Sequence, residues 1–188
     1  GEPLINAPAE NLSHTAFSFL TGANDATFCR NLLTERTGQT LDSLARKYQG
    51  EYVHRVELIP HCGHGIDYSP TTPWLSRHRR TPQPRHFLWE NFEMDGVKRN
   101  AFFNLEVLEE TAEGRTAYEF TAHAETNELE LKVWNVTYET AQSDSRWGIP
   151  LVFHRHLSPA PHGRLRVFLS PELADLSRPL RLSVNGSN

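Results

Sequence analysis

The sequence is poor in the features that define several classes of protein. Only two of its 188 residues are cysteine, Cys29 and Cys62, which is too few for a disulfide scaffold. No apolar run approaches the roughly 18 residues that a membrane-spanning helix requires. The formal charge of −4 lacks the basic surplus that a nucleic-acid-binding domain carries. We therefore expect a globular protein with neither a membrane nor a nucleic acid as its partner.

A strand–helix–strand pattern occupies the first part of the chain. Residues 17–21 form a short apolar run, as in a strand that is buried on both faces. Residues 28–48 carry apolar side chains at helical spacing, and residues 52–59 return to a strand pattern. Gly38 is expected to break the helix into two pieces, and Gly50 to end it. A strand, a helical crossover and a second strand predict a pair of parallel strands.

An acid and a histidine lie just past the ends of these two strands. Asp25 follows the first strand and His64 follows the second. Chemistry in open α/β sheets gathers at the carboxyl ends of parallel strands, so the two side chains are expected to meet. A carboxylate that binds one imidazole nitrogen fixes the tautomer and leaves the other nitrogen to act as a base. We therefore select Asp25 and His64 as the candidate catalytic residues.

The layout resembles the last βαβ unit of an α/β-hydrolase, in which the triad follows the chain order nucleophile, acid, histidine. Residues 20–25, Leu-Thr-Gly-Ala-Asn-Asp, and residues 63–65, Gly-His-Gly, are similar to predicted secreted esterases or peptidases of bacteria. The resemblance implies that Asp25 is the triad acid and His64 the triad histidine, with no cofactor. It also implies that the parent protein is periplasmic or extracellular.

The nucleophile motif of that family is missing, since no G-x-S-x-G occurs in the chain. The resemblance therefore implies the carboxyl-terminal part of a hydrolase of ester or peptide bonds. This part is expected to be inactive alone, with the upstream hydrolase core as its partner. A strand pair without its sheet exposes an edge and an apolar face. We thus expect a homo-oligomer through that edge, or packing of these strands onto the rest of the chain.

From residue 86 onward the pattern is that of β-strands. A linker at residues 82–85 divides a βαβ portion of the hydrolase core at residues 2–81 from a β-domain at residues 82–188. Short strands separated by turn residues predict an antiparallel β-sandwich, and the fold class is α+β. Residues 129–136 and 180–186 are similar to the β-domain that follows the core in the same bacterial proteins. The expected strands are residues 86–92, 100–110, 116–124, 128–138, 151–157, 164–169 and 180–184.

The two strand-end loops have other interpretations. Asp25 follows a glycine turn and fits the N-cap of the next helix. Asn24 and Asp42 are weaker alternatives for the acid. A metal site is a further alternative, although zinc sites usually take their ligands from two separated segments, and we expect no metal. The candidate ligands in the loop are His61, Cys62, His64 and Asp67.

The cysteines and two more histidines leave alternatives open as well. If Asp25 and His64 bond, Cys29 and Cys62 fall in one neighbourhood, where a disulfide is an alternative to two separate buried thiols. A cysteine nucleophile is a further, weaker alternative. His154 and His156 lie on one face of an expected strand, which is more often a polar face than a metal site.

The aromatic residues support a second function hypothesis. Exposed aromatic rings on a sandwich stack on sugar rings, so the β-domain would be a non-catalytic module that binds carbohydrate or protein. More often such residues pack in the core of a small β-domain. The residues concerned are Trp89, Tyr118, Trp134 and Trp147.

Overall fold

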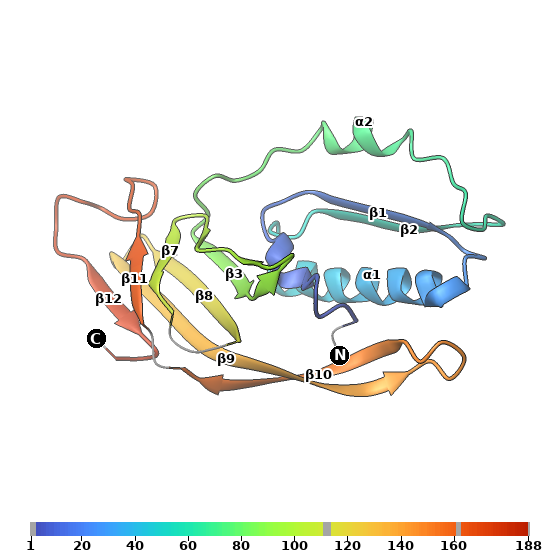
Figure 1. Cartoon of the computed structure of the whole chain (residues 1–188). Helices are drawn as coiled ribbons and strands as arrows, with labels where there is room; N and C mark the ends of the chain where they lie inside the picture. The colour runs from blue at the N-terminus through green and yellow to red at the C-terminus, as the bar shows by residue number, and fades with distance from the viewer. Residues whose placement is uncertain (1–2, 111–113, 161–162, 188) are drawn as a thin grey trace. The chain divides into compact units, whose positions relative to one another are not determined.

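The computed structural model describes residues 3–110, 114–160 and 163–187, and its fold class is α+β. The chain divides into two compact units, which are described separately (Figure 1). The first contains the residues up to Arg80 together with Tyr138–Arg155, and the second contains Thr81–Thr137 and the residues from His156 onward. Among the described residues, no helix is long and apolar enough to span a membrane.

The first unit is built on the predicted strand–helix–strand. β1 (Phe17–Gly22) and β2 (His54–Ile59) pair in parallel, with Phe17 opposite His54 and Gly22 opposite Ile59. α1 (Arg30–Lys47) connects them and packs on both strands. The parallel pair is therefore confirmed. The short helices of this unit are η1 (Ala9–Leu12), η2 (Thr27–Cys29) and α2 (Thr71–Leu75).

The prediction that Gly38 breaks the helix is wrong, because α1 runs through it without interruption. A Cβ atom at Gly38 would lie 3.2 Å from Cγ1 of Val56 on β2. The glycine therefore allows the helix to pack closely on the strand. Gly50 follows the end of α1 with φ of 83°, a backbone conformation that favours glycine. The buried residues Ala9, Leu41 and Tyr52 form the core of this unit.

The two strands of the first unit differ in character. β1 carries no charged side chain, whereas β2 carries Arg55 and Glu57, which form a bidentate ion pair at 2.8 and 2.9 Å. Within the described part of the chain, β1 and β2 pair only with each other. β2 thus resembles the charged edge strand of a sheet, and β1 resembles a strand from the interior of one.

The second unit contains two sheets and a short hairpin, except that the end of the strand Glu128–Ser143 and the start of the strand Pro150–Pro159 belong to the first unit. All the expected strands are found, at least in part, and most of the pairing is antiparallel. β12 is the exception, because it pairs in parallel with β9. One sheet has the order β10 (Pro150–Pro159), β9 (Glu128–Ser143), β8 (Arg115–His123) and β3 (His86–Asn91), with β12 (Arg181–Val184) also on β9. The other has the order β11 (Arg164–Val167), β7 (Leu105–Glu109) and β6 (Ala101–Phe102), and the hairpin is β4 (Glu93–Met94) with β5 (Val97–Lys98).

One apolar core is shared by the two sheets of the second unit. Phe87 on β3 stacks on Phe120 of β8, with ring centroids 5.2 Å apart, and both are fully buried. Leu105 on β7 contributes from the other sheet. Trp89 and Tyr118 stack on each other at 5.1 Å within this core and are 4% and 1% exposed. These two aromatic residues are therefore core residues and cannot stack on a sugar.

Candidate active site

The loops that follow β1 and β2 lie directly against each other. The backbone N–H of Asn24 donates to the carbonyl oxygen of Cys62 at 2.9 Å, and that of Ala23 donates to Ile59 at 2.9 Å. A Cβ atom at Gly22 would lie 1.9 Å from the carbonyl oxygen of Gly63, so only glycine fits there. The end of β1 is thus shaped to let the loop that carries His64 cross over it.

This contact brings the two predicted residues together. Nδ1 of His64 lies 2.9 Å from Oδ2 of Asp25. The second oxygen of Asp25, Oδ1, accepts a hydrogen bond from Nη1 of Arg30 at 3.2 Å. The Asp25 side chain is 5% exposed, whereas that of His64 is 78% exposed. A buried carboxylate, held on both oxygens, therefore presents an exposed imidazole.

The electrostatics favour an ionised Asp25. The hydrogen bond from His64 lowers the pKa of this carboxyl group below its ordinary value, and Arg30 lowers it further. Desolvation of the buried group opposes both effects but does not outweigh them. Asp25 thus carries a negative charge at neutral pH and acts only as an acceptor.

The protonation pattern of the ring follows from this acceptor. A carboxylate cannot donate, so Nδ1 of His64 must carry the proton that is shared with Asp25. Nε2 has no hydrogen-bond partner among the described residues. It is therefore the nitrogen that can accept a proton from a reacting group.

A cavity of about 230 Å³ adjoins the pair. Leu20 and Gly22 of β1 and Leu33 of α1 contribute to its wall, and His64 stands beside them. Tyr68, which follows the histidine loop, also lines the cavity. A reacting group that approached His64 through this cavity would meet a mostly apolar wall.

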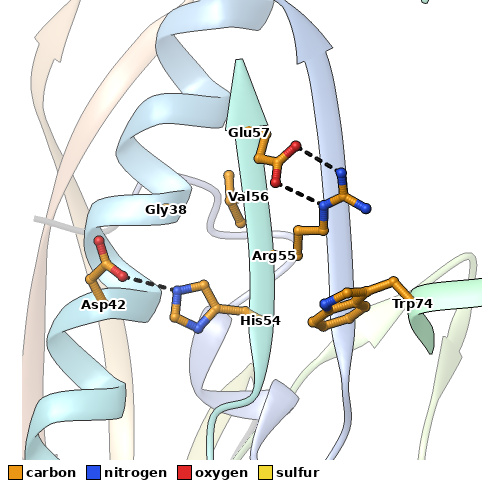
Figure 2. Close-up of a pocket in the computed structure, with 7 residues that line it drawn as sticks. All are labelled: Gly38, Asp42, His54, Arg55, Val56, Glu57 and Trp74. Atoms are coloured by element: carbon orange, nitrogen blue, oxygen red, sulfur yellow. Dashed lines mark hydrogen bonds and ion pairs between the residues drawn. The ribbon is translucent and has the colours of Figure 1, made fainter. Parts of the chain in front are cut away.

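Asp42, the alternative acid, binds a different histidine (Figure 2). Oδ1 of Asp42 on α1 lies 3.0 Å from Nε2 of His54 on β2, while Nδ1 of His54 lies 3.0 Å from the carbonyl oxygen of Tyr52. Both nitrogens of His54 are thus occupied, and neither is left to act as a base. A cavity of about 440 Å³ lies beside this pair, and its other lining residues are Gly38, Arg55, Val56, Glu57 and Trp74.

The remaining candidates do not gather around His64. The side chain of Asp67 binds the backbone N–H and hydroxyl group of Ser69 at 2.8 and 2.9 Å. Within residues 3–110, 114–160 and 163–187, no three His, Cys, Asp or Glu side chains are grouped to hold a metal ion. His154 and His156 are exposed on β10. Asn24 is exposed and contributes its backbone N–H to the loop contact.

The structure also bears on the alternatives for the two cysteines and for Asp25 as a helix cap. Cys29 is buried and Cys62 is half-buried, and both are free thiols. Burial and the neighbouring Asp144 raise the pKa of the Cys29 thiol, which disfavours the nucleophilic thiolate. Asp25 does not cap a helix, since the N-cap residue of α1 is Cys29 and the Asp25 carboxylate binds His64 and Arg30.

Sequence reasoning missed two contributors to the site, Arg30 and Gly22. Arg30 lies five residues after Asp25 at the start of a helix, and its charge was the available signal. The role of Gly22 depends on the loop from the other strand, and no local pattern in the sequence indicates that contact.

Comparison of the chain with protein-family models, with curated proteins and with solved structures finds no match in any of the three. The protein is therefore characterised by its own geometry. It is an α+β chain in which a buried carboxylate holds an exposed histidine at the ends of two parallel strands.

Proposed function

We propose that this chain is the carboxyl-terminal part of a serine hydrolase that cleaves ester or peptide bonds. The observation that carries the proposal is the 2.9 Å contact between buried Asp25 and exposed His64 at adjacent strand ends. The resemblance of the strand–helix–strand to an α/β-hydrolase supplies the reaction class. Asp25 and His64 are the triad acid and the triad histidine, and the chain alone does not turn over substrate.

The roles follow from the geometry. Nε2 of His64 takes the proton from the serine hydroxyl group while Oγ bonds to the carbonyl carbon and the π electrons of the carbonyl group move to its oxygen. The same nitrogen then returns the proton to the leaving alcohol or amine as the bond to the carbonyl carbon breaks. Asp25 keeps Nδ1 protonated and stabilises the imidazolium that forms in between. Arg30 holds the other carboxylate oxygen and so restricts rotation of the acid.

The serine and the oxyanion hole belong to an upstream core that joins at the open edge of β1. The backbone N–H groups of Phe17 and Ala23 point to β2, so those of the alternating residues Ser18, Leu20 and Gly22 point away from it. β1 carries no charged side chain, and several of its residues line the cavity beside His64. These features fit an interior strand whose second neighbour is supplied by the rest of the hydrolase.

Activity of the joined protein tests this proposal. The chain expressed with the coding sequence that precedes it is expected to hydrolyse a p-nitrophenyl ester or a peptide anilide, and the chain alone is not. The upstream sequence is expected to contain a serine in a strand-to-helix turn. An upstream sequence without such a serine, or activity that survives His64→Ala, would overturn the proposal.

The same open edge predicts the behaviour of the isolated chain. Without the core, β1 offers a row of unpaired backbone groups, and we expect the chain to form a homo-oligomer through it. Light scattering measures the mass, and a lysine in place of Ser18 should restore the monomer. By resemblance, the parent protein acts in the periplasm or outside the cell, and fractionation of cells that produce it tests this.

A further inference from the structure

A turn from far along the chain lies against the start of α1 inside the first unit. Residues 144–149 connect β9 to β10 (Figure 1). The outer part of this hairpin belongs to the first unit. The ring of Trp147 lies 4.8 Å from that of Phe28, between centroids. Asp144 of this turn lies close enough to Cys29 to raise the pKa of its thiol. The hairpin thus contacts the segment that directly follows Asp25.

Hydrogen bonds within the turn hold the backbone of Trp147 in place. Oδ2 of Asp144 accepts hydrogen bonds from the backbone N–H groups of Arg146 and Trp147, at 2.9 and 2.7 Å. The N–H of Gly148 donates to the Asp144 carbonyl oxygen at 3.0 Å. One aspartate therefore organises the turn, and its carboxylate lies near Cys29 on the other segment.

The backbone facing the turn is held in an unusual conformation. Phe28 and Cys29 have φ of 54° and 58°, in the left-handed region that residues other than glycine seldom adopt. Such residues persist where the surrounding structure constrains them, and they gather at functional sites. Here the conformation directs Phe28 outward, under the guanidinium group of Arg30 and against Trp147.

The result is a stack, in the loose sense of a row of four contacting side chains with tilted rings, that ends at the acid of the dyad. The guanidinium carbon of Arg146 lies 4.8 Å from the Trp147 ring centroid, and that of Arg30 lies 5.3 Å from the Phe28 ring centroid. Arg30 is also the residue that binds Oδ1 of Asp25. The Arg30 side chain is 39% exposed, so burial alone does not hold it in place. The contact with the Phe28 ring supplies the additional restraint.

We propose that Trp147 is a positioning residue for the Asp25–His64 dyad and acts through Phe28 and Arg30. The hairpin fixes Trp147, Trp147 fixes Phe28, and Phe28 fixes the guanidinium group that holds the carboxylate. The effect of Trp147 on catalysis rests on the proposed function. The effect of Trp147 on the Asp25–His64 contact can be measured in this chain alone.

The test uses the imidazole ring of His64 as the reporter. Nitrogen NMR of the ring distinguishes a proton on Nδ1 from one on Nε2, and the Nδ1–H form is expected to dominate in the native chain. In Trp147→Ala the population of the Nε2–H form is expected to rise about two- to fivefold, which corresponds to the loss of one exposed cation–π contact. Trp147→Phe keeps an aromatic ring in the stack and should restore the native ratio.

A matched control and a second variant complete the design. Phe168 in the second unit also lies under an arginine, Arg166, at 5.9 Å, so Phe168→Ala removes the same kind of contact away from the dyad and should leave His64 unchanged. If Trp147→Ala fails to fold, Phe28→Leu keeps an apolar side chain and removes the ring face, and the same shift is expected. An unchanged tautomer ratio in the folded variants would overturn the inference.

The two proposals fail in different ways. A tautomer shift in Trp147→Ala without hydrolysis by the joined protein would remove the proposed function and retain the positioning role. Hydrolysis that depends on His64, with kcat unaffected by Trp147→Ala, would retain the proposed function and remove the positioning role of Trp147. When both hold, kcat in Trp147→Ala should fall by the same fraction as the population of the Nδ1–H form, while KM stays constant.

Discussion

Two pairs of aspartate and histidine lie in the first unit at nearly the same distance, and they are arranged in opposite ways. In the Asp25–His64 pair the acid is 5% exposed and the histidine 78% exposed. In the Asp42–His54 pair the acid is 61% exposed and the histidine 14% exposed. A contact of about 3 Å therefore does not by itself define a catalytic dyad. The burial of each partner determines what the pair can do.

The placement of each pair explains the difference. Asp25 and His64 lie on loops that leave the ends of parallel strands, so the histidine can face a reacting group. Asp42 lies within α1 and His54 begins β2, so their contact ties the helix to the strand. His54 has both nitrogens occupied and His64 has one. The first pair fits proton transfer and the second fits a structural tether.

The largest expected effect comes from removing the charge of one acid and not the other. In the hydrolase that we propose, Asp25→Asn should lower kcat by about 10⁴-fold, because the amide can donate to Nδ1 and stabilise the wrong tautomer. Asp42→Asn is the matched control and should leave kcat unchanged. Steady-state kinetics of both variants on the same ester provides the measurement. Equal losses in the two variants would remove the distinction between the pairs.

The second effect concerns the glycine that allows the two loops to meet. In Gly22→Ala the new Cβ atom would collide with the Gly63 carbonyl oxygen, a backbone atom that cannot rotate away. We expect a loss of about 1–3 kcal/mol in the free energy of unfolding, and displacement of His64 from Asp25. Gly65→Ala is the control, since nothing lies within 4 Å of its Cβ position. Urea denaturation and the His64 ring signals check both results.

Much of the fold follows from local patterns in the sequence. The apolar run of β1, the helical spacing in α1 and the alternation in β9 predict these elements, and the structure confirms them. Gly38 was misjudged because its effect depends on Val56, which a distant strand brings beside it. The parallel pairing of β12 with β9 likewise depends on contacts between segments far apart in the chain. Local propensity does not contain such information.

The candidate site was predictable where it follows from topology. Asp25 and His64 were selected because parallel strands end at one edge, and the structure brings the two side chains together there. Their catalytic role stays a prediction. The contacts of Trp147 could not be anticipated, because it lies more than 100 residues from Phe28 in the chain. An aromatic residue in a turn carries no signal of its eventual neighbour.

The third prediction uses low pH to test how the Asp25–His64 contact depends on the charge of Asp25. The pKa of Asp25 is lowered from its ordinary value of 3.8, chiefly by the His64 hydrogen bond. A group whose pKa falls on folding adds stability above its unfolded pKa and loses it as the pH falls through the folded pKa. The difference in unfolding free energy between the native chain and Asp25→Asn should therefore be largest near neutral pH. It should shrink below pH 3.8. A difference that does not change between these conditions would show that the contact does not depend on the charge of Asp25.

The smallest effect is expected at the exposed acid of the second pair. Because Asp42 is 61% exposed, water and salt screen its charge, and Asp42→Asn should cost no more than about 1 kcal/mol of unfolding free energy. The asparagine oxygen can still accept a hydrogen bond from His54, so the tether between α1 and β2 is retained. Thermal denaturation in low and high salt measures the change, and salt should reduce it further. A larger loss that is insensitive to salt would mean that Asp42 acts as a buried partner, and the contrast between the two pairs would then rest on their ring nitrogens alone.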